Sequence, residues 1–350
     1  MEVDFLLIGQ GLAGTVLSHR LIQEGKSVHL IDEPKANLST RIAAGLYNPI
    51  TGKKMVKTWL ADSLFPEIGP LYRSLEKKLD AHFFHPRKIY RPFLSIEELN
   101  EWMGRSGDEN FQDYIDQVIS KPLYEEVVNP YGGVMLKNSG YVDLNRMLDS
   151  YQQYLLGEGL LTQERFDEEK LTVLEAYVEY NGIKASKIVY CNGLGSLDSR
   201  FFNFLPFAPV KGEVLELEEG FQPEEIINRG VFRITLPDGR LKVGSTYSKH
   251  DLDTGVTERA KEEILEKYDK LIRNGEKKII SHSYGIRPAT RDRKPFLGKH
   301  PEYESVYIFN GFGAKGVSLV PYLSKMMTNL LLLNQEVDKD VNISRFFKYI

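Results

Sequence analysis

The segment Phe5-Leu6-Leu7-Ile8-Gly9-Gln10-Gly11-Leu12-Ala13-Gly14 decides the fold. A compact apolar run, typical of a buried strand, ends directly in a Gly-x-Gly-x-x-Gly turn. Residues 15–24 then carry apolar side chains at helical spacing, and Gly25 marks the end of that helix. A second strand pattern covers residues 27–31 and is followed by Asp32. This order of strand, glycine turn, helix and strand predicts a β-α-β unit.

Each part of this unit has a physical reason to bind a dinucleotide. Gly9 permits the tight turn, Gly11 lets the backbone approach a pyrophosphate, and Gly14 allows the helix to pack closely on the strand. The acid at position 32 lies 32 − 9 = 23 residues after the first glycine, where a ribose hydroxyl is expected, and it favours FAD or NAD over NADP. The pattern therefore predicts a dinucleotide site formed by Gly9, Gly11, Leu12, Ala13, Gly14, Asp32 and Glu33. The alternative is a tight strand–helix turn that binds nothing.

Two further segments are predicted to touch the cofactor. Residues 39–49 are small and flexible, so they can wrap around an extended ligand, although a solvated loop is the alternative. A predicted β-meander over residues 171–190 ends in a second glycine turn. The cofactor contacts expected from these segments are Arg41, Ala43, Ala44, Gly45, Leu46, Gly193 and Gly195.

A second strand–glycine–helix pattern lies near the end of the chain. The strand predicted over residues 305–309 is followed by glycines at 311, 313 and 316, and a helix is predicted over residues 317–333. No strand with a terminal acid follows, so a second complete dinucleotide site is not expected. The glycines instead bring a helix N-terminus to the edge of a sheet, where it suits an electron-rich ring or a phosphate. The residues predicted to do so are Gly313, Ala314, Lys315 and Gly316.

Composition bounds the remaining possibilities. The 350 residues, with 42% hydrophobic and 27% charged side chains, predict a globular protein of about two domains. Helices are predicted over residues 59–81, 96–118 and 257–273, and we expect no metal site because the seven histidines lack ligand spacing. A net charge of −4 gives no reason to expect general nucleic-acid or membrane binding. The single cysteine, Cys191, and an N-terminus without a secretory pattern predict a cytoplasmic location.

Several motifs in this order resemble the FAD-dependent D-amino-acid-oxidase superfamily, which includes glycine oxidase, sarcosine oxidase and the oxidase half of a bifunctional tRNA wobble-uridine modification enzyme. They are the first glycine turn with its acid, Ala43-Ala44-Gly45, Pro209-Val210-Lys211-Gly212, Val243-Gly244-Ser245-Thr246, Gly285-Ile286-Arg287-Pro288, Asp292-Arg293 with Pro295, and Gly311 to Gly316. The resemblance implies an α/β fold, with a Rossmann-like FAD-binding domain and a second, α+β substrate domain built on an antiparallel sheet. The FAD-binding domain would comprise residues 1–80, 141–206 and 280–350, and the substrate domain residues 81–140 and 207–279.

The resemblance also implies roles for particular residues. Arg287 matches the arginine that holds the substrate carboxylate, with pairing to Asp292 or capping of carbonyls as the alternatives. Lys242 matches the lysine that sarcosine oxidases place near flavin N5 for oxygen activation, although strand alternation could turn it to solvent. Glycine oxidases carry an arginine in the last glycine loop, and Ala314-Lys315 is closer to the tRNA-modifying relatives. Because Cys191 is far from the C-terminal cysteine that anchors flavin in sarcosine oxidases, non-covalent FAD is expected.

The function implied is oxidation of the C–N bond of a small amine or amino acid. A hydride would pass to flavin N5, the imine would hydrolyse, and O2 is the expected acceptor. An alternative within the family is removal of a carboxymethyl group from a modified tRNA uridine, and tRNA is therefore not excluded as a partner. An alternative of another class is a non-catalytic FAD- or NAD-binding regulatory protein.

Overall fold

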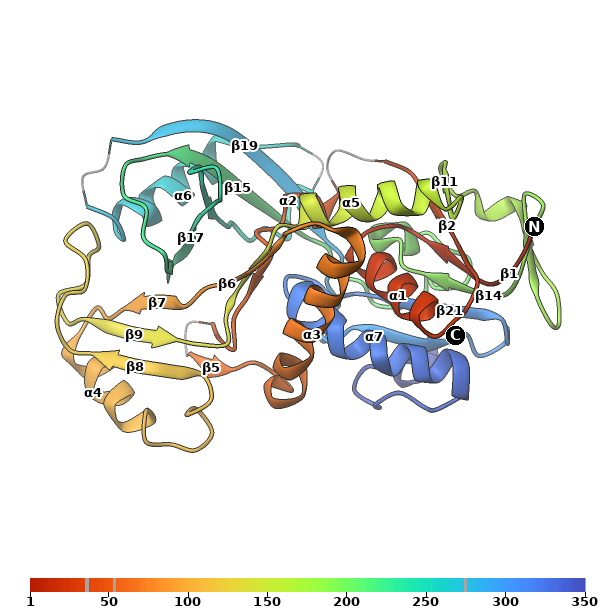
Figure 1. Cartoon of the computed structure of the whole chain (residues 1–350), viewed down its shortest axis with the longest axis horizontal. Coiled ribbons are helices and arrows are strands. Elements are labelled where there is room, and N and C mark those ends of the chain that lie inside the picture. The colour runs from red at the N-terminus through yellow and green to blue at the C-terminus, as the bar shows by residue number, and fades with distance from the viewer. Residues whose placement is uncertain (35–37, 53–54, 253, 274–275, 350) are drawn as a thin grey trace.

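Two eight-stranded sheets organise the chain in a computed structural model that describes residues 1–34, 38–52, 55–252, 254–273 and 276–349. Figure 1 shows the strands of the first sheet towards one end of the long axis and those of the second towards the other. Both chain ends lie on the side of the first sheet (Figure 1). The mixed α/β architecture agrees with the predicted fold class.

The first sheet contains the predicted β-α-β unit. Its path is β11 (Leu161–Gln163), β2 (Val28–Asp32), β1 (Glu2–Ile8), β14 (Ile183–Tyr190), β13 (Val178–Tyr180) and β12 (Leu171–Val173), and β14 also pairs with β21 (Val306–Asn310), which pairs with β20 (Phe296–Lys299). Helix α1 (Leu12–Gln23) connects β1 to β2, and these two strands pair in parallel with Phe5 opposite Val28. The second glycine pattern likewise joins β21 to helix α7 (Gly316–Leu333). Both glycine turns therefore follow parallel strands that flank β14.

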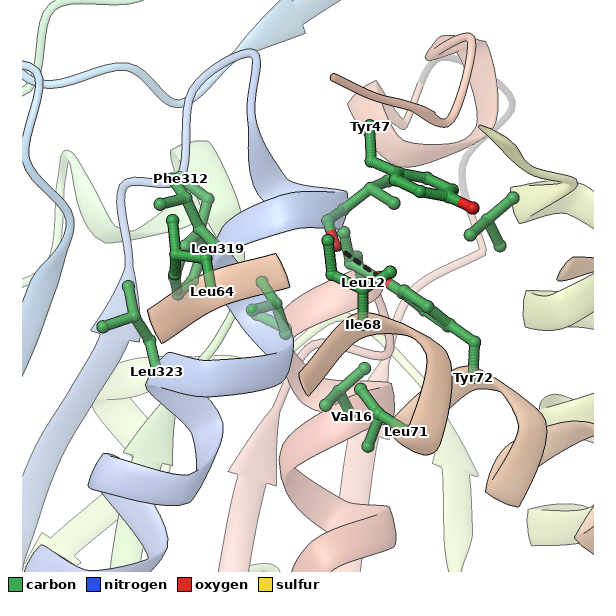
Figure 2. Packing of buried hydrophobic residues seen from close by; sticks show 14 of the residues in the cluster. Leu12, Val16, Tyr47, Leu64, Ile68, Leu71, Tyr72, Phe312, Leu319 and Leu323 are labelled. Atoms are coloured by element: carbon green, nitrogen blue, oxygen red, sulfur yellow. Dashed lines mark hydrogen bonds between the residues drawn. The ribbon is translucent and has the colours of Figure 1, made fainter. Parts of the chain in front are cut away.

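Helices α1, α7 and α3 (Ala61–Leu79) pack together through the largest apolar cluster. Figure 2 shows side chains of all three helices meeting, and the hydroxyl of Tyr72 donates a hydrogen bond of 3.0 Å to the carbonyl of Val317. Among the described residues, α7 is the one helix long and apolar enough to cross a membrane, and 61% of it is buried inside the molecule. Its burial against α1 and α3 accounts for its composition and fixes its N-terminus beside that of α1.

The second sheet is antiparallel apart from one parallel pair, β16 with β7. Its order is β19 (Lys278–Arg287), β15 (Val210–Glu218), β18 (Leu241–Gly244), β17 (Val231–Thr235), β16 (Ile226–Arg229), β7 (Ile89–Pro92), β9 (Gly133–Leu136) and β8 (Ile115–Ile119). Helix α6 (Glu258–Asp269) covers one face of this sheet, where Ile264 of the helix packs in one apolar cluster with Leu215 and Val243 of the strands. Because side chains alternate along a strand, the neighbours of these residues face the other way. The domain boundary predicted at residue 280 falls within β19.

The remaining elements belong to neither of the two eight-stranded sheets. They are α2 (Ser39–Ile42), β3 (Leu46–Tyr47), β4 (Ile50–Thr51), β5 (Val56–Lys57), β6 (Phe84–Pro86), α4 (Ile96–Arg105), β10 (Gly140–Val142), α5 (Leu144–Gly157) and three 3-10 turns at Glu168–Lys170, Gly193–Ser196 and Ile343–Tyr349. The helix predicted over residues 96–118 was wrong beyond Arg105. Ser95 caps its start as its position suggested, by accepting from the Glu98 amide at 3.3 Å. After Gly107, however, the Asp108 carboxylate accepts from the Asn110 amide at 2.9 Å and favours a turn.

Candidate functional site

A large cavity of about 1350 Å³ runs between the two sheets. It is lined by the turn between β1 and α1, the segments around residues 38–52, 165–170 and 190–200, the start of α7, and the face of the second sheet opposite α6. Pockets for small ligands usually measure about 300–1000 Å³. The cavity therefore has room for an extended cofactor together with a small substrate.

The first glycine turn presents bare backbone to this cavity. Gly9 has φ +101°, and a Cβ on Gly14 would lie 1.9 Å from the Gly9 carbonyl oxygen, so both positions require glycine. A Cβ on Gly11 would meet only the Thr40 hydroxyl, at 3.5 Å, because this position opens towards the cavity. The Asp32 carboxylate accepts a hydrogen bond of 2.8 Å from the Gln10 amide and so holds the turn in place. Gly14 itself does not line the cavity, in keeping with the packing role predicted for it.

The glycine turn before α7, residues 311–316, lies directly beside the turn between β1 and α1. A Cβ on Gly316 would lie 2.9 Å from the Leu12 side chain, and Gly313 has φ +55°. Lys315 donates from Nζ to the Thr51 hydroxyl at 3.0 Å, and burial lowers its pKa. All four residues predicted here line the cavity, so two helix N-termini, each without a side-chain cap, face the same space.

The segment after α2 reaches the cavity as predicted, with one exception. Gly45 has φ +69°, and a Cβ on it would lie 1.9 Å from the Val142 carbonyl oxygen. Arg41, in α2, forms an ion pair of 2.7 Å with Asp149 on α5 and is not among the residues that line the cavity, so its place near a phosphate stays a prediction. The predicted residues that do line the cavity are Gly9, Gly11, Leu12, Ala13, Asp32, Glu33, Ala43, Ala44, Gly45, Leu46, Gly193, Gly195, Gly313, Ala314, Lys315 and Gly316.

Arg287, at the end of β19, places its guanidinium over the backbone of β15. A Cβ on Gly212 would lie 2.0 Å from Nη2, so this position accommodates only glycine while the arginine keeps its place. Nη2 donates to the Ser245 hydroxyl at 2.8 Å and Nη1 to the Thr246 carbonyl at 3.4 Å. These two bonds hold the planar group at the cavity wall.

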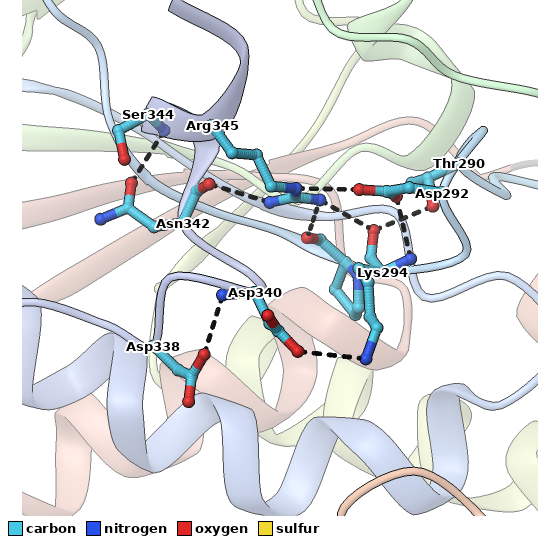
Figure 3. A network of polar contacts seen from close by, with 9 residues as sticks. Thr290, Asp292, Lys294, Asp338, Asp340, Asn342, Ser344 and Arg345 are labelled. Carbon is cyan, nitrogen blue, oxygen red and sulfur yellow. Dashed lines mark hydrogen bonds and ion pairs between the residues drawn. The ribbon is translucent and has the colours of Figure 1, made fainter.

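No carboxylate among the described residues pairs with this guanidinium. Asp292, the alternative partner weighed from the sequence, accepts from Arg345 at 2.9 Å instead. Figure 3 shows that contact within a polar network that ties residues 290–294 to the C-terminal segment. Burial lowers the pKa of Arg287, because the charge is partly removed from water without an anion beside it.

Lys242 lies on β18 between Leu241 and Val243, which pack against the α6 side of the sheet. Alternation therefore turns Lys242 towards the side of the cavity and away from α6. Its Nζ donates to the Ala43 carbonyl at 3.0 Å, and burial lowers its pKa. It does not line the cavity, because its ammonium lies against the backbone of the 43–45 loop.

Several cavity residues were not singled out from the sequence. Asn228 on β16 and Phe232 on β17 lie opposite each other in the sheet, and Arg91 lies on the adjacent strand β7. Ser245 was noted only as part of a motif. Alternation in Ile89-Tyr90-Arg91 was the available signal for Arg91, because Ile89 lines the same cavity.

The comparisons agree with this geometry. Residues 4–330 match the sequence model of a family described as FAD-dependent oxidoreductase (DAO). A glycine oxidase from Bacillus subtilis (strain 168) is 22% identical, over 96% of this chain and 95% of its own. Among solved structures, an iminodiacetate oxidase from Chelativorans sp. BNC1 superimposes with a TM-score of 0.80 at 19% identity, over 98% of both chains. A glycine oxidase from Geobacillus kaustophilus also gives 0.80, at 17% identity, over 99% of this chain and 98% of its own.

Proposed function

The chain belongs to the DAO family of FAD-dependent oxidoreductases, and on that premise we propose that it oxidises the C–N bond of an amino acid or N-substituted amino acid. The observation that carries the proposal is Arg287, a guanidinium at the cavity wall with no carboxylate partner among the described residues. A planar fork of N–H donors suits a carboxylate, and leaving such a charge unpaired in a partly buried place is unfavourable. A substrate carboxylate would remove that penalty.

The cavity fits the FAD that the family uses. Gly11 leaves open the space that a Cβ would enter, and the uncapped start of α1 offers amide groups to a pyrophosphate. Ala43 to Gly45 and Gly313 to Gly316 line the part of the cavity shared with the second sheet. These two loops would hold the ring, with the N-terminus of α7 favouring negative charge on it. FAD supplies the hydride acceptor, and the protein positions the substrate beside it.

The substrate side of the cavity offers positioning groups rather than a base. Among the lining residues that the structure describes in the second sheet and in residues 43–55, none is a carboxylate or a histidine. The substrate amine must therefore arrive neutral, since no such side chain is placed to take its proton. Loss of a hydride from the carbon and a proton from the nitrogen converts C–N to C=N, and water then hydrolyses the released imine to a carbonyl compound and an amine. By holding the substrate carboxylate, Arg287 would fix the position of the carbon that loses the hydride.

We further propose O2 as the electron acceptor, because the sequence contains a single complete dinucleotide fingerprint, which the FAD would occupy. Production of hydrogen peroxide in stoichiometric amounts with the carbonyl product would support this. Turnover that requires an artificial dye and yields no peroxide would contradict it.

The test of the main proposal is a panel of amines assayed anaerobically for bleaching of the flavin. Glycine, sarcosine and larger amino acids should reduce the flavin, and matched amines without the carboxylate should do so at least tenfold more slowly. In R287K the difference between the two groups should shrink at unchanged FAD content. Equal reduction by amines with and without a carboxylate would overturn the proposal.

A further inference from the structure

A second arginine at the same cavity also has no carboxylate partner among the residues that the structure describes. Arg91, on β7, is partly buried and lines both the main cavity and a smaller one of about 310 Å³ next to it. Its guanidinium makes no hydrogen bond or ion pair with any residue that the structure describes. Burial and the nearby charge of Arg229 lower its pKa to about 10, and the more weakly acting Glu98 opposes that shift without reversing it.

The positive charge of Arg91 has no carboxylate of its own among the charged residues around it. Three arginines (91, 105 and 229) and two glutamates (98 and 101) line the smaller cavity. Arg229 binds Glu98 through two hydrogen bonds of 2.8 Å, and Arg105 pairs with Glu101 at 2.5 Å. Both glutamates are therefore already used, and the remaining positive charge is that of Arg91.

The sheet places Arg91 across the cavity from Arg287. Val214 pairs with Gly244, Gly244 with Phe232, and Phe232 with Asn228. In the parallel pair of β16 and β7, Ile227 lies opposite Tyr90, so the next residues in register are Asn228 and Arg91. This row spans four strand spacings, about 19 Å at roughly 4.8 Å each. The guanidinium of Arg287 lies over Gly212 near one end of the row, and Arg91 lies at the other end. Both residues line the same cavity, and an arginine side chain covers part of the row, so a molecule shorter than the row would suffice to contact both.

We infer that Arg91 binds a second acidic group of the substrate. The substrate is then an amine with a carboxylate near its nitrogen and another acidic group, a carboxylate or a phosphate, at the end of an extended chain. This inference rests on the proposed function, because Arg287 is taken to hold the first carboxylate. Asn228 and Phe232 lie between the two arginines and offer an amide and an apolar surface to the connecting chain.

The test uses the purified holoenzyme and ligands that cannot be oxidised. Calorimetric Kd values are measured for glutarate, adipate and pimelate, and for the monocarboxylates of equal length, valerate, hexanoate and heptanoate. We expect the best dicarboxylate to bind at least tenfold more tightly than its monocarboxylate. A parallel measurement with 4-phosphonobutyrate distinguishes a preference for phosphate at the far end from a preference for carboxylate.

Variants separate this inference from the function on which it rests. R91Q should abolish the advantage of the dicarboxylate and leave the Kd of the monocarboxylate unchanged, whereas R287K should weaken both. R73Q removes the same charge outside both cavities, beside the ring of Phe84, and should change neither. FAD content and Tm of R91Q verify that it folds.

Equal binding of the two ligand series by the wild type, or a dicarboxylate advantage that survives in R91Q, would overturn the role of Arg91. Arg287 would keep its role in that case if R287K still weakens monocarboxylate binding. Monocarboxylate binding that R287K leaves unchanged would instead overturn the proposed function.

Discussion

Replacing Gly212 by alanine should displace the guanidinium of Arg287 while leaving the arginine itself in the sequence. The new Cβ would lie 2.0, 2.4 and 2.6 Å from Nη2, Cζ and Nη1 of the guanidinium. Ordinary contact begins at 3.4 Å, so the group must move by at least 3.4 − 2.0 = 1.4 Å or tilt away. That movement breaks the 2.8 Å bond to Ser245, and a misplacement of about 1 Å can lower a rate by roughly 100-fold.

The assay is kcat/KM for a carboxylate-bearing amine, with FAD content and Tm measured in parallel. We expect G212A to lose about 10- to 100-fold in kcat/KM while keeping its FAD, since the loss corresponds to one displaced charge-assisted contact of about 1.5–3 kcal/mol. G220A is the matched control, because a Cβ there would meet nothing within 4 Å. The double variant G212A/R287A should be no worse than R287A alone. Additive losses, or full activity in G212A, would refute the contact between Gly212 and Arg287 as the cause.

Four further predictions concern FAD binding, the protonation of the substrate amine and the buried His19. G11V should not retain FAD, because its side chain would enter the open space beside Gly11; a visible spectrum equal to that of the wild type would contradict this. K242M should weaken FAD binding several-fold by freeing the Ala43 carbonyl, with the exposed Lys278→Met as control; slower reoxidation by O2 at unchanged anaerobic reduction would instead support the predicted role in oxygen activation. The kcat/KM value should rise with pH up to the pKa of the substrate amine, and the midpoint of that rise should shift with the amine pKa from one substrate to another. A midpoint that stays at the same pH for every substrate would instead indicate a titrating base on the protein. Burial lowers the pKa of His19 to about 4 from 6.5, so the unfolded state binds the extra proton more readily and stability falls as pH drops from about 6.5 towards 4. Between pH 7 and pH 5 the contribution of His19 to the unfolding free energy should fall by roughly 2 kcal/mol, so H19Q should lose about that much less than the wild type in urea titrations at the two pH values.

The sequence predicted those parts of the structure around the cavity that depend on local pattern. The turn between β1 and α1 and the turn before α7 were both found, because strand, glycine spacing and helix are contiguous there. The helix predicted over 96–118 failed beyond Arg105, where local turn chemistry at Asp108 competes with an amphipathic pattern. Arg41 was predicted to lie near a phosphate because its neighbours in the sequence are small and flexible. Its ion pair with Asp149 is a tertiary contact that composition does not reveal.

Arg91 and Gly212 could not be recognised in that way, because their roles arise from strand pairing over long sequence separations. Arg91 reaches the cavity only because β7 pairs with β16, which joins residues 89–90 to residues 226–227. Gly212 matters only because Gly285, its partner on β19, lies two residues before Arg287 and brings the guanidinium over its Cα. Neither pairing has a local sequence signal.

The contrast among the arginines of this molecule is the strongest reason to assign Arg287 and Arg91 to a ligand. Arg229, Arg105 and Arg345 each bind a carboxylate, as structural arginines do when they are partly buried. Arg287 and Arg91 are partly buried too, yet neither has a carboxylate partner among the described residues, and both line the same large cavity. Two unpaired guanidinium groups at the same cavity lower the stability of the ligand-free protein. An anionic substrate that contacts both would reverse that loss on binding, so part of its affinity comes from charges that the fold leaves unsatisfied.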